Sequence, residues 1–321
     1  MFNTPEKIFI TGATGFVGSH LVRRFIGGGA EVHILSRPNS DTWRINDIIQ
    51  KIHRHDANII ETGKIKGILS EIQPTYIIHC ANAGVYGGIS VADEELIQVN
   101  LLGLVSLLSA SDSVSYKGFI NVGSSSEYGL KNRPMKETDI CEPMNAYGVS
   151  KLAATLYASF VAHSRQRPIV TLRLFSPFGP YDDHRRLISR VILDILNHKE
   201  VKLANPNAVR DYIFIEDVVT LFLEVKEKVH SLAGEVFNVG FGKEYKISEV
   251  VEEIFKQMGP DGSVEWGVKS VSPWEPKKWE ANMEKTLSSF TWRPVYSLER
   301  GIKKTIEWFT DHRGLYRRFE S

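Results

Sequence analysis

The feature that most constrains the fold is a glycine-rich turn between an apolar run and a helical pattern near the start of the chain. Residues 8–11 form the apolar run, and glycine follows at positions 12, 15 and 18. One glycine allows a tight turn, another lets the backbone approach a pyrophosphate, and another lets the helix pack against the sheet. The helix expected over residues 17–27 offers unpaired N–H groups and a positive dipole end to phosphates. The residues expected to bind a dinucleotide here are Gly12, Thr14, Gly15, Phe16, Val17 and Gly18.

Short apolar runs and helical patterns alternate through the first half of the chain. Alternation at this spacing is typical of an α/β protein with a parallel sheet and helices on both faces. We therefore predict a Rossmann-type, doubly wound parallel sheet. The expected strands cover residues 8–11, 31–36, 76–80, 118–123 and 169–175, and the clearest helices cover residues 94–111 and 146–165.

The pattern changes after residue 175, where a segment rich in Pro, Gly and Asp, residues 176–183, predicts a loop. Amphipathic helices are expected over residues 188–198, 247–258 and 297–309. We expect residues 1–175 to form the NAD(P)-binding domain and residues 176–321 to form a smaller C-terminal substrate-binding domain. Residues 209–240 are expected to return to the first domain.

Composition excludes several classes of function. The 321 residues include 39 basic and 38 acidic side chains, so no strong field attracts nucleic acid or an anionic membrane. The two cysteines lie far apart and the ten histidines show no metal-ligand spacing, so we expect neither a disulfide framework nor a metal site. No apolar run reaches the roughly 18 residues of a membrane span. The first residues show no signal-peptide pattern, and we expect a cytoplasmic enzyme.

The end of the second expected strand bears on the choice of nicotinamide cofactor. A carboxylate there would hold the ribose 2′-hydroxyl of NAD. This chain has Ser36 and Arg37 instead, and no acid occurs before Asp41. Arg37 could pair with a 2′-phosphate while Ser36 donates a further hydrogen bond, which favours NADP. Alternatively, Arg37 stacks on the adenine or faces solvent, and NAD remains possible.

Two polar motifs suggest acid–base chemistry at a carbonyl or alcohol. Tyr147 and Lys151 are four residues apart on an expected helix, so they share one face. A nearby ammonium stabilises tyrosinate, and the tyrosine can then exchange a proton with the substrate oxygen. A serine-rich loop, residues 123–129, follows an expected strand at the edge of the sheet where ligands bind. Taken singly, the first motif could be a surface pair and the second an ordinary turn.

Together these motifs resemble the extended short-chain dehydrogenase/reductase family, which contains nucleotide-sugar epimerases, dehydratases and reductases. The resemblance covers nearly the whole chain. It implies that Ser124, Tyr147 and Lys151 form the catalytic triad, with Ser125 as a fallback for the hydroxyl role. The resemblance also includes His79-Cys80-Ala81, Asn100, and residues 172–175, 178–180, 210–213, 237–240 and 292–294.

The same resemblance implies ligand contacts and a partner. Asp56, after the third strand, would touch the adenosine end of the cofactor. Ala81 and Asn100 would lie on the cofactor side, together with Tyr147 and Lys151. Arg210 would touch the nucleotide or diphosphate of a nucleotide-sugar substrate. The family forms homodimers through a helix bundle, so we expect a homodimer.

The chain departs from the family pattern in places that affect the reaction. Dehydratases of the family follow the catalytic hydroxyl with an acid pair, whereas this chain has Ser125 and Ser126. Ser176 stands where many members have an asparagine that contacts substrate. The usual substrate-binding arginine near the C-terminal loop is absent, and Lys277 or Lys278 could replace it, unless both are simply solvated.

Two further groups could contact substrate. Tyr86 lies in a glycine-rich loop after an expected strand and could close over the site. Trp266, Trp274 and Trp279 lie in the irregular C-terminal region. These tryptophans could line a sugar pocket or serve as packing anchors.

The sequence therefore predicts an NAD(P)-dependent nucleotide-sugar oxidoreductase. Its leading form is an NADPH-dependent reductase of a nucleotide-linked 4-keto-6-deoxyhexose. The close alternative is an epimerase that oxidises and re-reduces one carbon with tightly held NAD. A dehydratase and a non-catalytic nucleotide-sensing protein rank lower, because the acid pair is missing and because a sensor has no need of Tyr147.

Overall fold

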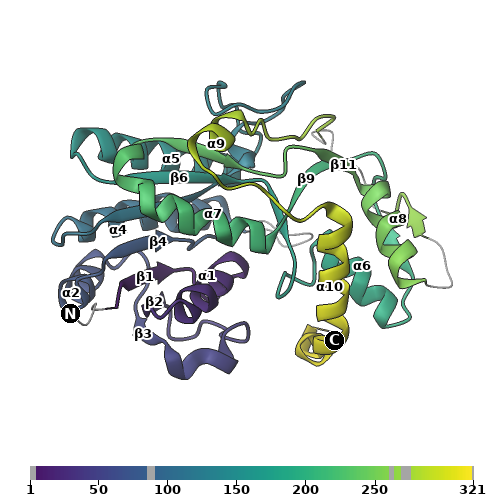
Figure 1. Ribbon diagram of the computed structural model, residues 1–321, viewed down its shortest axis with the longest axis horizontal. Helices are drawn as coiled ribbons and strands as arrows, with labels where there is room; N and C mark the ends of the chain where they lie inside the picture. Colours follow the sequence, from purple (N-terminus) through teal and green to yellow (C-terminus); the bar gives the residue numbers. More distant parts are fainter. Residues whose placement is uncertain (1–4, 85–90, 260–263, 269–275, 320–321) are drawn as a thin grey trace.

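A seven-stranded parallel sheet forms the centre of the molecule. The computed structural model describes residues 5–84, 91–259, 264–268 and 276–319. The strand order is β10-β6-β5-β4-β1-β2-β3, and every neighbouring pair is parallel (Figure 1). The order reverses between β1 and β4, which creates the crevice where α/β sheets bind ligands. The predicted fold class is therefore confirmed. The strands are β1 (Lys7–Thr11), β2 (Glu31–Ser36), β3 (His53–Asp56), β4 (Tyr76–His79), β5 (Gly118–Ser124), β6 (Ile169–Leu174) and β10 (Val236–Val239).

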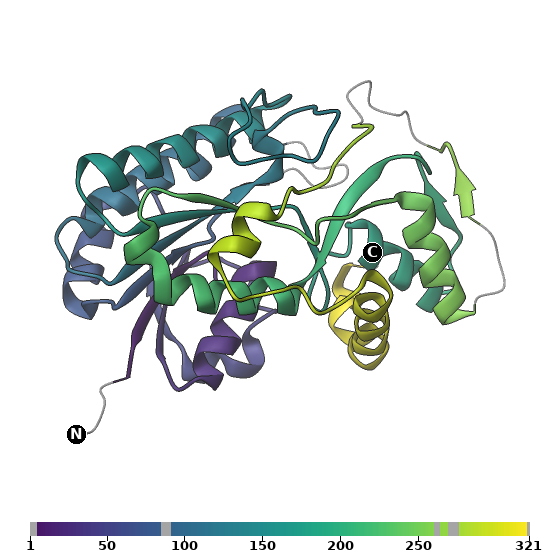
Figure 2. The same cartoon turned by 45° about the horizontal axis from the view of Figure 1, so that its top comes forward.

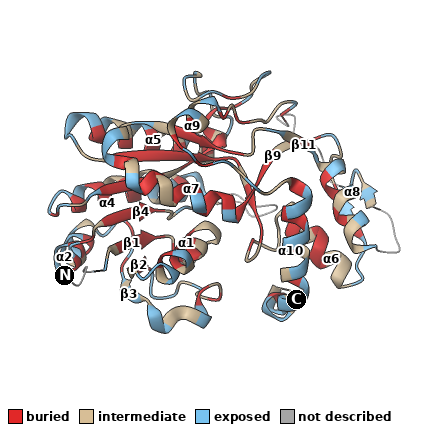
Figure 3. Ribbon diagram, in the orientation of Figure 1, coloured by how far each residue is buried: buried red, intermediate tan, exposed pale blue. Residues whose placement is uncertain are grey.

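Side chains that alternate along the strands place the sheet between two apolar cores. Ile8 and Ile10 belong to one core, together with α1 and α7, whereas Phe9 belongs to the other, with α2, α4 and α5. Successive strand residues point to opposite faces, so a strand that is apolar throughout must be covered on both. Figure 3 shows this burial concentrated in the strands. The helices are α1 (Phe16–Gly27), α2 (Thr62–Ile72), α4 (Gly103–Ser111), α5 (Ala146–Ser164) and α7 (Ile215–Lys228).

A smaller lobe lies beside the carboxyl ends of the strands (Figures 1 and 2). Its helices α6, α8 and α10 pack against one another. Two small sheets, ordered β11-β9-β7 and β12-β8, accompany them. The helices of this lobe are α6 (Leu187–Leu196), α8 (Ile247–Met258) and α10 (Leu298–His312), and its strands are β7 (Ser176–Phe178), β8 (Val201–Leu203), β9 (Val209–Phe214), β11 (Glu244–Lys246) and β12 (Val264–Trp266). Helix α9 (Glu284–Ser289) lies instead against β10 of the central sheet.

Three local features differ from the sequence pattern. Strand β3 has the polar sequence HRHD. It lies at the edge of the sheet and is mostly exposed, so no apolar run marks it in the sequence. The helix expected over residues 94–111 contains a π-helical segment, η2 (Gln98–Leu102), between α3 (Asp93–Ile97) and α4. The loop expected over residues 176–183 begins with β7, because Ser176 pairs with Tyr212 of β9.

Four short 3₁₀ segments complete the described part of the chain, namely η1 (Asn46–Lys51), η3 (Ser125–Glu127), η4 (Val229–Leu232) and η5 (Arg313–Phe319). None of the helices in the described ranges combines the length and apolar character that a bilayer span needs.

Candidate active site

A cavity of about 990 Å³ lies at the carboxyl ends of β1, β4 and β5. Most of the residues that the sequence nominates line it, although they come from segments spread over more than half of the chain. The nominated residues that line it are Gly12, Thr14, Gly15, Phe16, Val17, Gly18, Ser36, Arg37, Ala81, Ser124, Ser125, Tyr147, Lys151, Ser176 and Arg210.

The glycine-rich turn has the geometry that a phosphate cradle requires. Gly12 has a φ of +69°, and a Cβ built there would lie 2.4 Å from the Ala81 nitrogen. A Cβ on Gly18 would lie 2.2 Å from the Gly12 carbonyl oxygen. Gly15 precedes α1 and provides no side-chain cap, so the first N–H groups of this helix remain available at the cavity. Available N–H groups at a helix N-terminus fit the diphosphate of a dinucleotide.

The end of β2 offers a hydroxyl with no protein partner. Ser36 is 7% exposed and lines the cavity, and its buried Oγ has no hydrogen-bond partner. Arg37 follows it along the wall, and Arg54 Nη2 donates to the carbonyl oxygens of Arg37 (3.1 Å) and Pro38 (2.9 Å). Because an orphaned buried hydroxyl is costly, Ser36 fits a cavity wall that meets a polar ligand.

Two of the expected cofactor residues do not line the cavity. Asp56 is the last residue of β3, and its carboxylate pairs with Arg54 Nε at 2.9 Å. Asn100 is buried in the π-helical segment, where it bonds both the N–H and the carbonyl of Ala83 and also Ser150. Since Ala83 lines the cavity, Asn100 supports the wall.

All three residues of the expected triad line the cavity. Ser124 ends β5, and its Oγ accepts from the Ser126 N–H at 3.1 Å. Tyr147 lies in the first turn of α5, which Asn145 caps by accepting from Gly148 N at 2.8 Å. Lys151 follows one turn later, and its Nζ donates to the Val122 carbonyl at 2.5 Å. A strand end and a helix start thus present a hydroxyl, a phenol and an amine together.

Charges beneath the triad are buried and paired. Glu127 and Arg173 form an ion pair of 2.6 Å in which both side chains are almost inaccessible. Burial lowers the pKa of the Lys151 ammonium, and the charge of Glu127 opposes that shift. His79 Nδ1 lies 2.8 Å from Thr11 Oγ1, and burial lowers the pKa of His79 to about 3, so this imidazole is neutral near pH 7.

The cavity wall contains a contact that the sequence did not single out. Trp279 Nε1 donates to Ser125 Oγ at 3.2 Å, and the Arg210 guanidinium lies 5.6 Å from the centre of a Trp279 ring. Lys277, which was expected to contact substrate, is exposed and does not line the cavity. Tyr86 lies outside the described residues. Trp279 was one of three tryptophans without a distinguishing pattern, so no local signal selected it.

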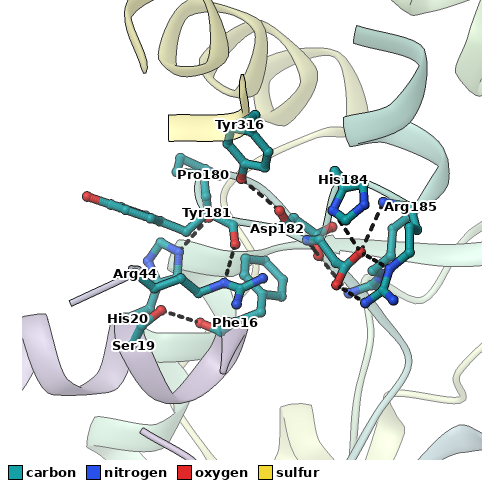
Figure 4. Close-up of polar contacts among 12 residues, drawn as sticks. Phe16, Ser19, His20, Arg44, Pro180, Tyr181, Asp182, His184, Arg185 and Tyr316 are labelled. Carbon is teal, nitrogen blue, oxygen red and sulfur yellow. Dashed lines mark hydrogen bonds and ion pairs between the residues drawn. The ribbon is translucent and has the colours of Figure 1, made fainter. Parts of the chain in front are cut away.

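A charged cluster that the sequence analysis also missed lies where the two lobes meet (Figure 4). Arg44 Nε donates to the Tyr181 carbonyl at 2.7 Å, and Tyr316 OH donates to the Asp182 carbonyl at 2.7 Å. Arg186 pairs with the Asp182 carboxylate at 3.1 Å. Burial raises the pKa of Asp182 to about 6. Because Arg44, Asp182 and Arg186 also line the cavity, these contacts join the two lobes at the cavity wall.

Comparison with known proteins agrees with this geometry. Residues 8–240 match the model of the NAD dependent epimerase/dehydratase family. CDP-abequose synthase of Salmonella muenchen is 26% identical, over 95% of this chain and 99% of that protein. The crystal structure of UDP-glucose 4-epimerase from Thermotoga maritima with UDP-glucose is 26% identical, with a TM-score of 0.87 over 95% of this chain and 99% of that one.

A second solved structure is similar to the same extent. UDP-glucuronic acid 4-epimerase from Bacillus cereus, in complex with UDP-glucuronic acid and NAD, is 25% identical. Its TM-score is 0.85, over 95% of this chain and 99% of that one. The family match covers the glycine-rich turn, the triad and most of the sheet, and the expected resemblance is confirmed: the chain belongs to the NAD dependent epimerase/dehydratase family.

Proposed function

We propose that this protein is an NAD(P)-dependent oxidoreductase of a nucleotide-linked sugar, and that it reduces a 4-keto-6-deoxyhexose with NADPH. The observation that carries the proposal is the loop after Ser124. Its first two residues are serines, and the carboxylate of Glu127 is occupied by the Ser124 N–H (2.7 Å) and by Arg173 (2.6 Å). This loop therefore supplies hydroxyls and no available acid, which suits reduction of a carbonyl better than elimination of water.

Each residue of the proposed triad has a separate role in such a reduction. A bound nicotinamide supplies the hydride that reaches the keto carbon. Tyr147 gives a proton to the keto oxygen, and Ser124 orients that oxygen by a hydrogen bond. Lys151 holds the cofactor ribose and favours the charged form of the tyrosine that has given up its proton. Positioned acid catalysis of this kind contributes about 10²–10⁴-fold to a rate.

The preference for NADPH rests on this chain's own residues. The unpartnered Ser36 hydroxyl and the Arg37 side chain border the same cavity, and β2 ends without a carboxylate. A guanidinium pairs with a phosphate through two parallel hydrogen bonds. The B. cereus epimerase carries NAD, so the distinction has to come from measurement.

A second candidate is an epimerase with tightly held NAD. It is favoured by the similarity to the two solved 4-epimerases, each of which matches 95% of this chain. The reductase and the epimerase would use the same triad, and they differ in the fate of the cofactor. A reductase consumes its dinucleotide, whereas an epimerase returns it unchanged.

The test is cofactor identity and turnover on the purified protein. Any bound dinucleotide is extracted, NADPH and NADH are titrated by fluorescence, and absorbance is followed with UDP- and dTDP-linked 4-keto-6-deoxyglucose. Tighter binding of NADPH, with one NADPH oxidised per sugar reduced, is the expected result. Co-purifying NAD with interconversion of a UDP-hexose and no net change in absorbance would replace the reductase with the epimerase.

The Arg37→Ala variant sharpens this test. Loss of a charge-assisted contact to the 2′-phosphate weakens NADPH binding by about tenfold or more and leaves NADH binding nearly unchanged. Arg24→Ala is the matched control, because Arg24 is exposed on α1 and does not line the cavity. Equal losses for both dinucleotides in Arg37→Ala would remove the argument for NADP.

We also propose that the protein forms a homodimer. The outer face of α5 exposes Leu156 and Phe160, whose exposed fractions are 61% and 57%, and also Val149 at 46%. These positions are seven and four residues apart, so they form one apolar stripe. Large apolar side chains on one helix face favour burial against a partner. Light scattering coupled to size-exclusion chromatography measures the assembly directly.

A further inference from the structure

The segment that carries Trp279 is hydrogen-bonded to two strands of the smaller lobe, β11 and β9. The Trp279 N–H donates to Glu244 Oε2 at 2.8 Å, and Lys278 pairs with the other oxygen of Glu244 at 3.1 Å. Two residues later, the Ala281 N–H donates to the buried carboxylate of Asp211 at 3.0 Å. These contacts fix the backbone at and after Trp279, so the indole projects from an anchored segment.

The contact between Trp279 and Ser125 has a defined direction. An indole N–H can only donate, so Ser125 Oγ must be the acceptor in the 3.2 Å hydrogen bond. The Ser125 hydroxyl keeps one hydrogen of its own to donate. Ser125 is 4% exposed and lines the cavity, and its side chain has no second hydrogen-bond partner among the described residues. The remaining hydrogen is therefore available to a group inside the cavity.

We propose that Trp279 is a positioning residue that makes Ser125 a hydrogen-bond donor to the substrate. The indole takes a lone pair of Ser125 Oγ, and the Ser125 O–H then donates to a sugar oxygen beside the carbon that reacts at Ser124 and Tyr147. This inference deepens the proposed function and rests on it for the nature of the substrate. Ser125 stands where dehydratases of the family have an acid. In this proposal Ser125 hydrogen-bonds a sugar oxygen and does not transfer its proton.

The matched substitution for Trp279 is phenylalanine. Trp279→Phe removes the N–H donor and keeps an aromatic ring under the Arg210 guanidinium. The chain also offers a control, because Trp292 Nε1 donates to the Asp217 carbonyl at 3.0 Å and Trp292 does not line the cavity. Trp292→Phe removes an equivalent indole donor from a structural position.

The hydrogen bond itself is tested by nuclear magnetic resonance on the full chain, without turnover. The six tryptophans are labelled with ¹⁵N at the indole, and the Trp279 signal is identified by its loss in Trp279→Phe. In Ser125→Ala the Trp279 indole proton moves to lower frequency and exchanges faster with solvent, while the Trp292 signal stays in place. An unmoved Trp279 signal would overturn the proposal even if the protein proves to be a reductase.

The role toward substrate is tested by kinetics with UDP-4-keto-6-deoxyglucose or whichever nucleotide sugar of the panel the wild type converts. Ser125→Ala and Trp279→Phe each lower kcat by about fivefold to tenfold, as expected for one neutral hydrogen bond, with unchanged dinucleotide affinity. The double variant loses no more than Ser125→Ala alone, because Trp279 acts through Ser125. Additive losses, or an equal kcat loss in Trp292→Phe, would mean that Trp279 only supports the fold.

If the wild type converts no nucleotide sugar of the panel, the proposed function fails. The resonance experiment still decides whether Trp279 orients Ser125, so the two failures are distinguishable.

Discussion

The end of the cavity that we assign to the dinucleotide and the end that we assign to the substrate are built in different ways. The dinucleotide end is made by residues that are close in sequence, namely the turn between β1 and α1 and the end of β2. At the substrate end, Ser125 meets Trp279, which lies 154 residues later, and Trp279 lies under Arg210. Local backbone requirements therefore define one end, whereas long-range packing defines the other.

The largest expected effect concerns Tyr147, which lines the cavity. Tyr147→Phe removes the proton donor and lowers kcat by about 10²–10⁴-fold, while the dinucleotide dissociation constant changes little. The measurement is steady-state turnover together with a fluorescence titration of the dinucleotide. Tyr157→Phe on the same helix is the control, since Tyr157 does not line the cavity. Full activity in Tyr147→Phe would rule out this assignment.

The next effect tests how far the substrate end depends on long-range pairs. Glu127→Gln leaves the buried Arg173 guanidinium without its counter-charge, which costs about 3–5 kcal/mol of the free energy of unfolding. Glu142→Gln breaks the Lys131–Glu142 pair, in which the Glu142 side chain is 69% exposed, and costs about 1 kcal/mol or less. Urea denaturation followed by circular dichroism measures both. Similar losses of unfolding free energy in the two variants would show that the buried Glu127–Arg173 pair is no more important than an exposed pair.

A smaller effect tests the local character of the dinucleotide end. Gly18→Ala forces a Cβ to within 2.2 Å of the Gly12 carbonyl oxygen. Overpacking of this kind costs about 1–3 kcal/mol, and we expect weaker dinucleotide binding as well. Gly27→Ala, at the other end of α1, meets nothing within 4 Å and should stabilise the protein by about 0.5–1 kcal/mol. Thermal unfolding with and without dinucleotide measures the stability and the dinucleotide binding of both variants. Equal changes in stability for Gly18→Ala and Gly27→Ala would refute the predictions.

The last effect is a dependence on pH, modest per pH unit, at His79, which ends β4 and contacts Thr11. Burial lowers the pKa of His79 from 6.5 to about 3, so the stability that its neutral form contributes is present above pH 6.5 and is lost as the pH falls toward 3. Relative to His79→Gln, the free energy of unfolding of the wild type should fall by up to about 1.4 kcal/mol per pH unit in that window.

Urea denaturation at several pH values measures this difference, and other titrating groups cancel between the two proteins. Thr11→Val is the control, because it removes the hydroxyl beside His79 and leaves the titrating group in place. Its difference from wild type should change much less with pH than that of His79→Gln. A pH-independent difference for His79→Gln would show that His79 does not titrate as proposed.

The sequence predicted the elements whose residue pattern is set by local structure, such as the buried strands of the sheet. The apolar runs located most strands of the sheet, because a parallel strand covered on both faces has to be apolar throughout. Strand β3 escaped this rule, since an exposed edge strand has no such requirement. The π-helical segment within residues 93–111 also gave no periodic signal, although it places Asn100 behind the cavity wall.

The sequence by itself determined the class of sheet, the glycine-rich turn between β1 and α1, and the types of the polar residues that line the cavity. Each depends on a short-range requirement: space for a backbone, the face of a strand, or the spacing of one helical turn. Only the tertiary structure decided that Trp279 hydrogen-bonds Ser125 and that Glu127 forms an ion pair with Arg173. It also decided that Arg44 hydrogen-bonds the Tyr181 carbonyl and so links the two lobes. These contacts join residues that are far apart in the sequence, and a contact of this kind produces no periodic pattern near either residue.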